Sequence, residues 1–206
     1  MSHAETLPLA APGLTAVLFG LSGCLVDFGA RARQQTIALP EHTEATPGAL
    51  DSLHSLQRQQ IPCAWLDDLP PALAQSLSVA LPASIKPAQH SATINPWPAP
   101  NACWQALMDL NVGSLDGCVL VSGEPRLLQS GLNAGLWTIG LASCGSLCGL
   151  SPSEWQALSQ NERDQRRGKA TLQLFGLGVH SVIDHLGELD TCLADINLRR
   201  LKGEKP

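Results

Sequence analysis

The segment AVLFGLSGCLVD, residues 16–27, has the pattern of a buried strand that runs directly into a glycine-containing loop. In sheets built from alternating strands and helices, ligands bind at the carboxyl ends of the strands. The residue at that point of this chain is Gly20, which has no side chain to react. The segment therefore predicts the platform of an α/β site without its reactive group.

The composition is that of a globular chain with one main core. Its 206 residues are 44% hydrophobic and 15% charged, with a net charge of −5 and a pI near 5.6. The 13 Lys and Arg residues form no sustained basic stripe, so we expect no nucleic-acid partner. The opening MSHAETLPLAAPG has no basic segment followed by an apolar one, so we expect a cytoplasmic protein without a secretory signal or anchor.

An uncharged stretch, residues 127–153, is long enough to span a bilayer. Gln129, Asn133 and several Ser and Gly residues within it argue against a membrane span. A buried helix followed by a buried strand explains the same stretch, because a strand covered on both faces is apolar throughout. We therefore expect no contact with a membrane.

Seven cysteines are scattered through apolar segments, and we expect them to be reduced and buried. Cys144 and Cys148 form a CxxxC pair, but no second cluster in the sequence has metal-ligand spacing. The nearest histidines, His180 and His185, lie far along the chain. The sequence thus predicts no zinc site.

Apolar segments alternate with amphipathic ones along the chain. The predicted strands are residues 15–20, 61–66, 117–122, 136–141 and 180–184. Between them, segments with helical spacing open with Pro or Ser, and Thr46 followed by Pro47 is the predicted start of the first helix. Repeated strand and helix units predict a Rossmann-like α/β fold, a three-layer sandwich around a mostly parallel sheet of five or six strands. Residues 29–45 and 82–100 are rich in Pro and polar residues, so we expect loops with at most short strands there.

Four segments together resemble one known family. They are AVLFGLSGCLVDFGARA (16–32), TPGALDSLHSLQRQQIP (46–62), NPWPAP (95–100) and SGLNAGLWTIGL (130–141). In this order and spacing they resemble the phosphonatase-like branch of the haloacid dehalogenase (HAD) superfamily. The resemblance implies a HAD-like fold and, in active members, Mg²⁺-dependent hydrolysis through an Asp nucleophile.

The chain departs from the family pattern at each catalytic motif. Gly20 stands at the nucleophile position, followed by Ser22, and Asn95 stands where a cation is expected. Gly123 and Leu127 stand where the family places its magnesium-binding acids. These positions are therefore interpreted as vestigial, and we expect no catalytic residue, no bound metal and no cofactor.

The cap domain of the family is also expected to be absent. Only residues 29–45 lie where the cap would be inserted, and they contain no Lys. We therefore expect a single core domain over residues 1–206, with residues 29–45 as a short remnant that leaves the carboxyl edge of the sheet uncovered.

The polar and aromatic residues near that edge are the candidate ligand-binding residues: Ser22, Cys24, Trp65, Asp67, Asp68, Asn95, Trp97 and Glu124. Simpler interpretations stand beside this one. The acids can be solvated loop residues or charges at helix starts, Cys24 a small buried apolar residue, and Asp27 a local turn cap. The tryptophans can be core or interface residues, and Trp97 among its prolines can stay exposed.

Two functions remain open on the sequence. The favoured one is a non-catalytic protein that binds a protein partner, a second copy of itself or a small molecule through the uncapped edge, where Trp65, Leu66 and Trp97 are predicted to form an exposed apolar patch. The alternative is an atypical hydrolase of a small phosphorylated or phosphonate compound with a relocated active site. The missing acid at position 20 favours the first.

Overall fold

The computed structural model describes residues 13–35, 39–88 and 95–206. A six-stranded sheet forms its centre, in the order β3-β2-β1-β4-β5-β6. All the strand pairs are parallel. The strands are β1 (Ala16–Gly20), β2 (Cys63–Leu66), β3 (Lys86–Pro87), β4 (Cys118–Ser122), β5 (Trp137–Leu141) and β6 (Ser181–Ile183). The predicted α/β class and the predicted strand count are confirmed, and the sheet is parallel throughout.

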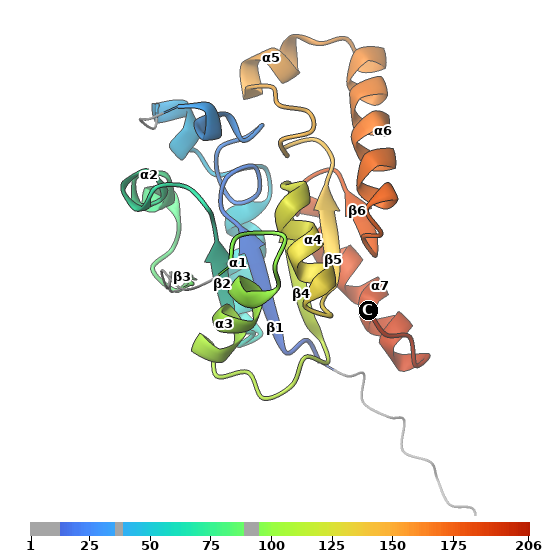
Figure 1. Ribbon diagram of the computed structural model, residues 1–206. Coiled ribbons are helices and arrows are strands. Elements are labelled where there is room, and N and C mark those ends of the chain that lie inside the picture. Colours follow the sequence, from blue (N-terminus) through green and yellow to red (C-terminus); the bar gives the residue numbers. More distant parts are fainter. Residues whose placement is uncertain (1–12, 36–38, 89–94) are drawn as a thin grey trace, which may run out of the picture.

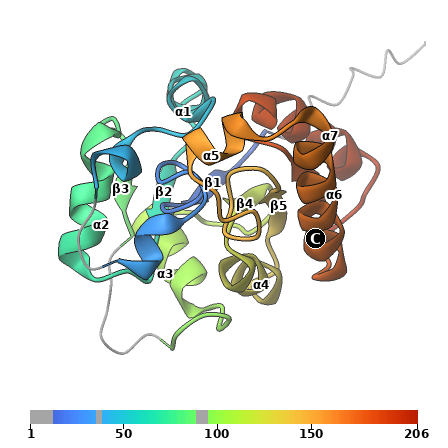
Figure 2. The ribbon, with the colours of Figure 1, turned by 90° about the horizontal axis from the view of Figure 1, so that it is seen from above.

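Helices cover both faces of the sheet (Figure 1). The α-helices are α1 (Ala49–Arg58), α2 (Pro71–Leu77), α3 (Asn101–Asp109), α4 (Pro125–Asn133), α5 (Pro152–Ala157), α6 (Gln160–Gly176) and α7 (Leu189–Leu201). Four short 3-10 helices are η1 (Arg31–Gln34), η2 (Pro40–Thr43), η3 (Ser78–Ala80) and η4 (Leu186–Glu188). Viewed onto the carboxyl edge, α1 lies on one side of the sheet, and α3 and α4 lie on the other (Figure 2).

Alternate residues of each strand supply the two halves of the core. Val17 and Val119 pack with apolar residues of α1, α2 and α7 on one face, whereas Leu18 and Leu120 pack with α3 and α4 on the other. Because both faces are covered, the central strands are apolar throughout. The uncharged stretch from 127 to 153 is explained in this way, since α4 and β5 are largely buried within it. No helix among the described residues is long and apolar enough to cross a membrane.

The predicted start of the first helix is wrong by two residues. Helix α1 begins at Ala49, after Gly48 in the left-handed conformation at φ 80°. Thr46 does not cap the helix, because its hydroxyl donates to the carbonyl oxygen of Cys24 in the loop after β1. The helix is therefore tied to the site loop rather than capped by Thr46.

The long helix α6 was not predicted as a separate element. Its first turns are highly polar, and only Ala170 and Leu174 are buried, so it shows little helical periodicity of apolar residues. Its start is marked by a capping box in which Ser159 and Glu162 bond to each other's backbone N–H groups. That local signal identifies the helix where the periodicity does not.

The two segments expected to be irregular run near the carboxyl edge. Residues 29–45 contain η1 and η2 instead of short strands, with residues 36–38 outside the described part. Residues 82–100 contribute β3, the short sixth strand of the sheet, and residues 89–94 lie outside the described part. The connection after β1 thereby brings η1 over the ends of the strands.

Candidate functional site

The loop after β1 forms the floor of the site. Leu21 continues the strand by donating its N–H to the Leu66 carbonyl at 3.0 Å, and the N–H of Gly23 then donates to the Val26 carbonyl at 2.9 Å. Gly23 has φ 69°, a conformation that favours glycine. The chain thus turns back tightly just beyond Gly20 and carries Ser22 and Asp27 into the interior.

Asp27 holds this loop to η1. Its carboxylate accepts a hydrogen bond from the Ser22 hydroxyl at 2.6 Å and from the backbone N–H groups of Arg31 at 3.0 Å and Ala32 at 3.0 Å. Burial raises the pKa of Asp27, and these hydrogen bonds oppose the rise. The interpretation of Asp27 as a turn cap is confirmed, and the capped segment is the one that carries Arg33.

Arg33 lies among three carboxylates that follow two strands, β2 and β4. Its guanidinium is 2.6 Å from Asp68, 3.7 Å from Asp67 and 3.7 Å from Glu124. The guanidinium carbon also lies 5.8 Å from the ring centre of Trp97, within reach of a cation–π interaction. We call Arg33, Asp67, Asp68 and Glu124 the Arg33 cluster.

Sequence reasoning missed Arg33. It lies in a segment interpreted only as a remnant loop, and nothing in the spacing of GARARQQ connects it to acids 34 to 91 residues away. The one signal was the run VDFGARA, which the resemblance singled out and in which Asp27 fixes the first turn of η1.

Asp67 is buried, which corrects its interpretation as a solvated loop acid. It is 3% exposed and accepts hydrogen bonds from the N–H groups of Ser22 at 3.1 Å and Leu69 at 2.8 Å. Burial raises the pKa of Asp67, whereas the charge of Arg33 lowers it. Asp68 is more exposed and also lies 3.8 Å from Arg126.

Glu124 marks the start of α4, as the helix-charge interpretation expected. Its side chain accepts the N–H of Arg126 at 3.3 Å, and its own N–H donates to the Ser122 hydroxyl at 3.0 Å. Arg126 donates in turn to the Trp97 carbonyl at 2.6 Å. These bonds anchor the segment that contains Trp97 beside the Arg33 cluster.

Close packing surrounds the positions where the resemblance expects a nucleophile and metal-binding acids. A Cβ atom placed on Gly20 would lie 2.7 Å from the Ser122 hydroxyl oxygen and 3.4 Å from a methyl group of Leu127. A Cβ atom on Gly123 would lie 2.2 Å from the Gly23 carbonyl oxygen and 2.4 Å from the Cα atom of Gly145. These positions therefore lie at neighbouring strand ends. Their surroundings are backbone atoms, the Ser122 hydroxyl group and the buried Leu127 side chain.

The predicted apolar patch is wrong. Trp65, Leu66 and Trp97 are 6%, 3% and 5% exposed and pack into the protein's own core, Trp65 on one face of the sheet and the other two on the opposite face. Trp97 is buried despite its prolines, because Arg33 covers its ring and Arg126 holds its carbonyl group.

The two remaining candidates do not join the Arg33 cluster. Asn95 is exposed at the start of the described segment 95–206. Cys24 is fully buried, and its thiol contacts the Val121 carbonyl oxygen at 3.4 Å. Burial raises the pKa of the Cys24 thiol well above its ordinary value, so the thiolate form is disfavoured. Cys24 is therefore a small core residue, and all seven cysteines of the chain are free thiols.

Comparison with known proteins agrees with the fold and the motifs. No model of a known protein family matches the chain. Over 109 residues, 53% of the chain, it is 38% identical to a phosphonoacetaldehyde hydrolase of Klebsiella pneumoniae. This likeness supports a relationship of the chain to the phosphonatase-like HAD hydrolases. This match covers only 40% of the Klebsiella enzyme, so the phosphonatase-like chain spans less than half the length of that relative.

Two solved structures share the fold. One is 63% identical, covers 94% of this chain and 100% of its own, and superimposes with a TM-score of 0.91. The other is a phosphonoacetaldehyde hydrolase-like protein from Oleispira antarctica, 22% identical over the full length of both chains, with a TM-score of 0.83. The second likeness establishes the fold of this HAD relative and nothing further.

Proposed function

We propose that this phosphonatase-like chain is a non-catalytic binding protein that has lost the catalytic groups of its family. The observation that carries the proposal is the contact at Gly123. The Gly23 carbonyl oxygen and the Gly145 Cα atom occupy the space that any side chain at position 123 would need. Because these obstacles are backbone atoms, an acid at this position is incompatible with the present fold of the loop.

The residues around Gly20 do not fit Mg²⁺, which active members of the family use. Mg²⁺ requires near-octahedral oxygen ligation, usually through carboxylates and water. Gly20, Gly123 and the buried Leu127 offer no side-chain oxygen. The carboxylates of Asp67 and Glu124 already lie beside the guanidinium of Arg33 and accept backbone N–H groups, and that of Asp27 accepts the Ser22 hydroxyl and backbone N–H groups. No step of a metal-dependent mechanism is therefore assigned to this chain.

The electrostatics of the Arg33 cluster also oppose phosphoryl binding. Three carboxylates surround the guanidinium of Arg33. A second guanidinium, that of Arg126, lies 3.8 Å from Asp68. An incoming phosphate or phosphonate group would compete with these carboxylates for Arg33 and would be repelled by them. In a catalytic site the preorganised charges would instead stabilise the transition state.

Further parts of the proposal concern organisation and place. We infer one core domain without a cap, in which η1 and Arg33 lie over the strand ends. We also infer a cytoplasmic location, because seven free thiols are typical of a reducing compartment. A protein partner or second copy at the carboxyl edge remains part of the proposal, now carried by the charged Arg33 cluster instead of an apolar patch.

The test is phosphate release from a panel of small phosphate esters and phosphonoacetaldehyde with Mg²⁺ present. We expect no turnover above background from the wild type or from Gly20→Ala, and no Mg²⁺ binding by calorimetry. The alternative, an atypical hydrolase, predicts turnover that Gly20→Ala leaves intact and that Asp67→Asn or Glu124→Gln abolishes. That result would refute the non-catalytic assignment and establish a relocated active site.

A further inference from the structure

A cavity of about 400 Å³ lies at the carboxyl edge, away from the Arg33 cluster. Its walls come from η2 and the segment between η2 and α1, from α5 and the first turns of α6, and from the loops after β1, β5 and β6. We call it the α5–α6 cavity. In Figure 1, α5 and the start of α6 rise above the strand ends. The volume lies within the usual range for small-molecule sites, which is roughly 300 to 1,000 Å³.

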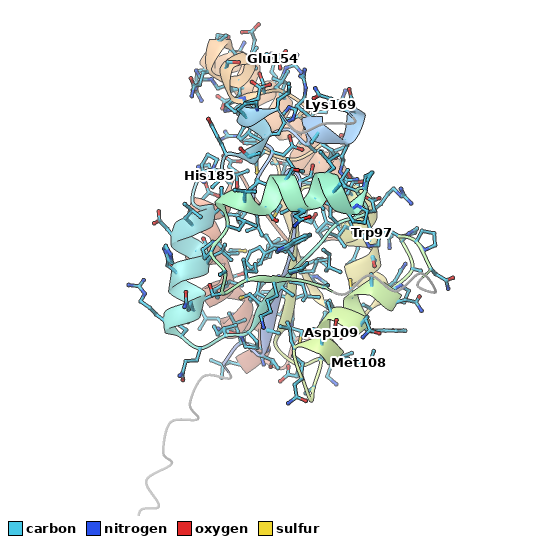
Figure 3. All side chains as sticks on the ribbon, turned by 90° about the vertical axis from the view of Figure 1, so that its left-hand side faces the viewer. Trp97, Met108, Asp109, Glu154, Lys169 and His185 are labelled. Atoms are coloured by element: carbon cyan, nitrogen blue, oxygen red, sulfur yellow. The ribbon has the colours of Figure 1, made fainter. Side chains whose placement is uncertain are left out.

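The α5–α6 cavity is separate from the site described above, because its lining contains no member of the Arg33 cluster. His185, which lines the cavity, is labelled on the α1 side of the molecule in Figure 3, whereas Trp97 is labelled on the opposite side, near α3. The cavity is also held in shape locally. Arg31 of η1 pairs with Glu154 of α5 at 2.8 Å and donates to the Gly149 carbonyl at 3.2 Å.

Two aromatic rings form part of the wall. Phe28 and Trp155 both line the cavity, with ring centres 6.3 Å apart and planes inclined at 52°. Phe28 is nearly buried, and Trp155 is half-buried. A ring that faces a cavity offers apolar contact area and a negative face that attracts cations.

The charges of the lining are predominantly negative. The lining contains more acidic than basic side chains. The acidic residues are Glu41, Glu44, Asp164 and Asp184, and the basic ones are Arg163 and Arg167. Both guanidinium groups are engaged by the protein. Arg167 lies 2.6 Å from Asp184 and 2.9 Å from Asp164, and Arg163 donates to the Leu158 carbonyl at 3.1 Å.

The two glutamates have no comparable partner. Glu41 lies 3.7 Å from the His42 ring, and Glu44 makes no ion pair with any residue that the structure describes. Unmatched charge in the lining is thus carried by the carboxylates of Glu41 and Glu44, and a cationic ligand would neutralise it.

Ser143 adds a polar group to the lining. The residue is 5% exposed and lines the cavity directly after β5 and Ala142. Its N–H donates to the Asp184 carbonyl at 3.1 Å, but its hydroxyl group makes no hydrogen bond with any described residue. The Ser143 hydroxyl oxygen is not one of the buried side-chain atoms that lack a partner, so it is open to water or to a ligand in the cavity.

We propose that the α5–α6 cavity binds a small organic ammonium compound, with its apolar body against Phe28 and Trp155 and its cationic group near Glu41 and Glu44. The Ser143 hydroxyl group would bond to a polar atom of the same ligand. This inference goes beyond the proposed function, because it assigns a ligand class to a different site and does not depend on whether the chain retains hydrolase activity.

The test compares two probes of nearly equal size and opposite charge, phenethylamine and phenylacetate. Binding to the full chain is measured by calorimetry and by the NMR shift of the Trp155 indole N–H, assigned with a Trp155→Phe variant. We expect phenethylamine to bind at millimolar concentration or below and phenylacetate at least tenfold more weakly. Tetramethylammonium, which carries the charge without the aromatic body, should bind more weakly than phenethylamine.

Two matched double variants each remove two negative charges, one pair from the cavity lining and the other from outside the cavity. Glu41→Gln with Glu44→Gln should weaken phenethylamine binding about tenfold. Asp51→Asn with Asp195→Asn, which removes two exposed carboxylates outside the cavity, should leave it unchanged. The proposal is overturned if phenethylamine fails to bind at 10 mM, if phenylacetate binds equally well, or if both double variants weaken binding to the same extent. Phosphate release is read separately, so neither result decides the other.

Discussion

Three backbone segments meet at Gly23, Gly123 and Gly145, so a methyl group added at position 123 is predicted to lower the stability of the fold. In Gly123→Ala, the new Cβ atom would lie 2.2 Å from the Gly23 carbonyl oxygen and 2.4 Å from the Gly145 Cα atom. Neither atom can rotate away, because both belong to the main chain. The loops after β1, β4 and β5 must therefore move apart.

Overpacking of this kind costs about 1 to 3 kcal/mol, and we expect the upper end because both obstacles are backbone atoms. For a chain of this length, 1 kcal/mol corresponds to roughly 2 to 4 °C in Tm. Gly123→Ala should therefore lower Tm by roughly 6 to 12 °C in a thermal scan. The result bears on the proposed loss of the metal site, because the family resemblance places a magnesium-binding acid at position 123. An aspartate there would meet the same obstacles and also bury a charge.

The matched control is Gly113→Ala. Gly113 is exposed, and a Cβ atom there would meet nothing within 4 Å. The same methyl group should therefore shift Tm by no more than about 2 °C in either direction, as surface changes of ±0.5 kcal/mol do. Equal Tm values for Gly123→Ala and Gly113→Ala would show that the three loops are not closely packed and would remove the main support for the proposed loss of the family's metal site.

Three further predictions concern the same loops. Gly20→Ala should destabilise the protein through the Ser122 hydroxyl, and adding Ser122→Ala should recover about 1 kcal/mol by chemical denaturation; strictly additive effects would contradict this contact. Arg33→Met should cost about 1 to 3 kcal/mol near pH 7, below the value for a fully buried pair because the Arg33 side chain is 20% exposed. The loss should shrink as the pH falls, because Asp67, whose pKa is already raised by burial, becomes protonated and no longer needs a cation; a pH-independent loss would contradict this. Asp27→Ala should cost about 1 to 3 kcal/mol in urea unfolding, and Asp27→Asn less, because an amide oxygen can still accept the N–H groups of Arg31 and Ala32 and asparagine tolerates the φ of 57°.

The fold was predictable because it depends on properties that lie along the sequence. Strands buried on both faces are short apolar runs, and Pro or Ser marks most helix starts. Helix α6 was not predicted because it lacks an apolar stripe with helical spacing. Its sequence instead shows a capping box and only two residues that are buried. Thr46 was misassigned because its hydroxyl bonds across 22 residues to Cys24, a contact that no local pattern reveals.

The site was less predictable because its contacts join distant segments. The sequence could identify Asp67, Asp68 and Glu124 as acids after strands, since parallel strands place their ends at one edge. It could not show that Arg33 neutralises them, because only the folded η1 brings that guanidinium to the strand ends. For the same reason Trp65 and Trp97 were expected on the surface, although the segments around them fold over and bury both rings.

If the chain has lost phosphoryl chemistry as proposed, the packing of the loops after β1, β4 and β5 and the Arg33 cluster predict that no single substitution would restore it. An acid at Gly20 would still face the Leu127 side chain, and an acid at Gly123 would still meet two backbone segments. Removing Arg33 to admit a phosphoryl group would take away the guanidinium that lies 3.7 Å from the buried Asp67. Residues that act as a unit contribute far from additively, so each change alone is expected to lower stability without giving activity. In the present arrangement three carboxylates lie 2.6 to 3.7 Å from the Arg33 guanidinium, whose buried Nε atom has no hydrogen-bond partner among the described residues, so a bound anion would have to displace these ion pairs.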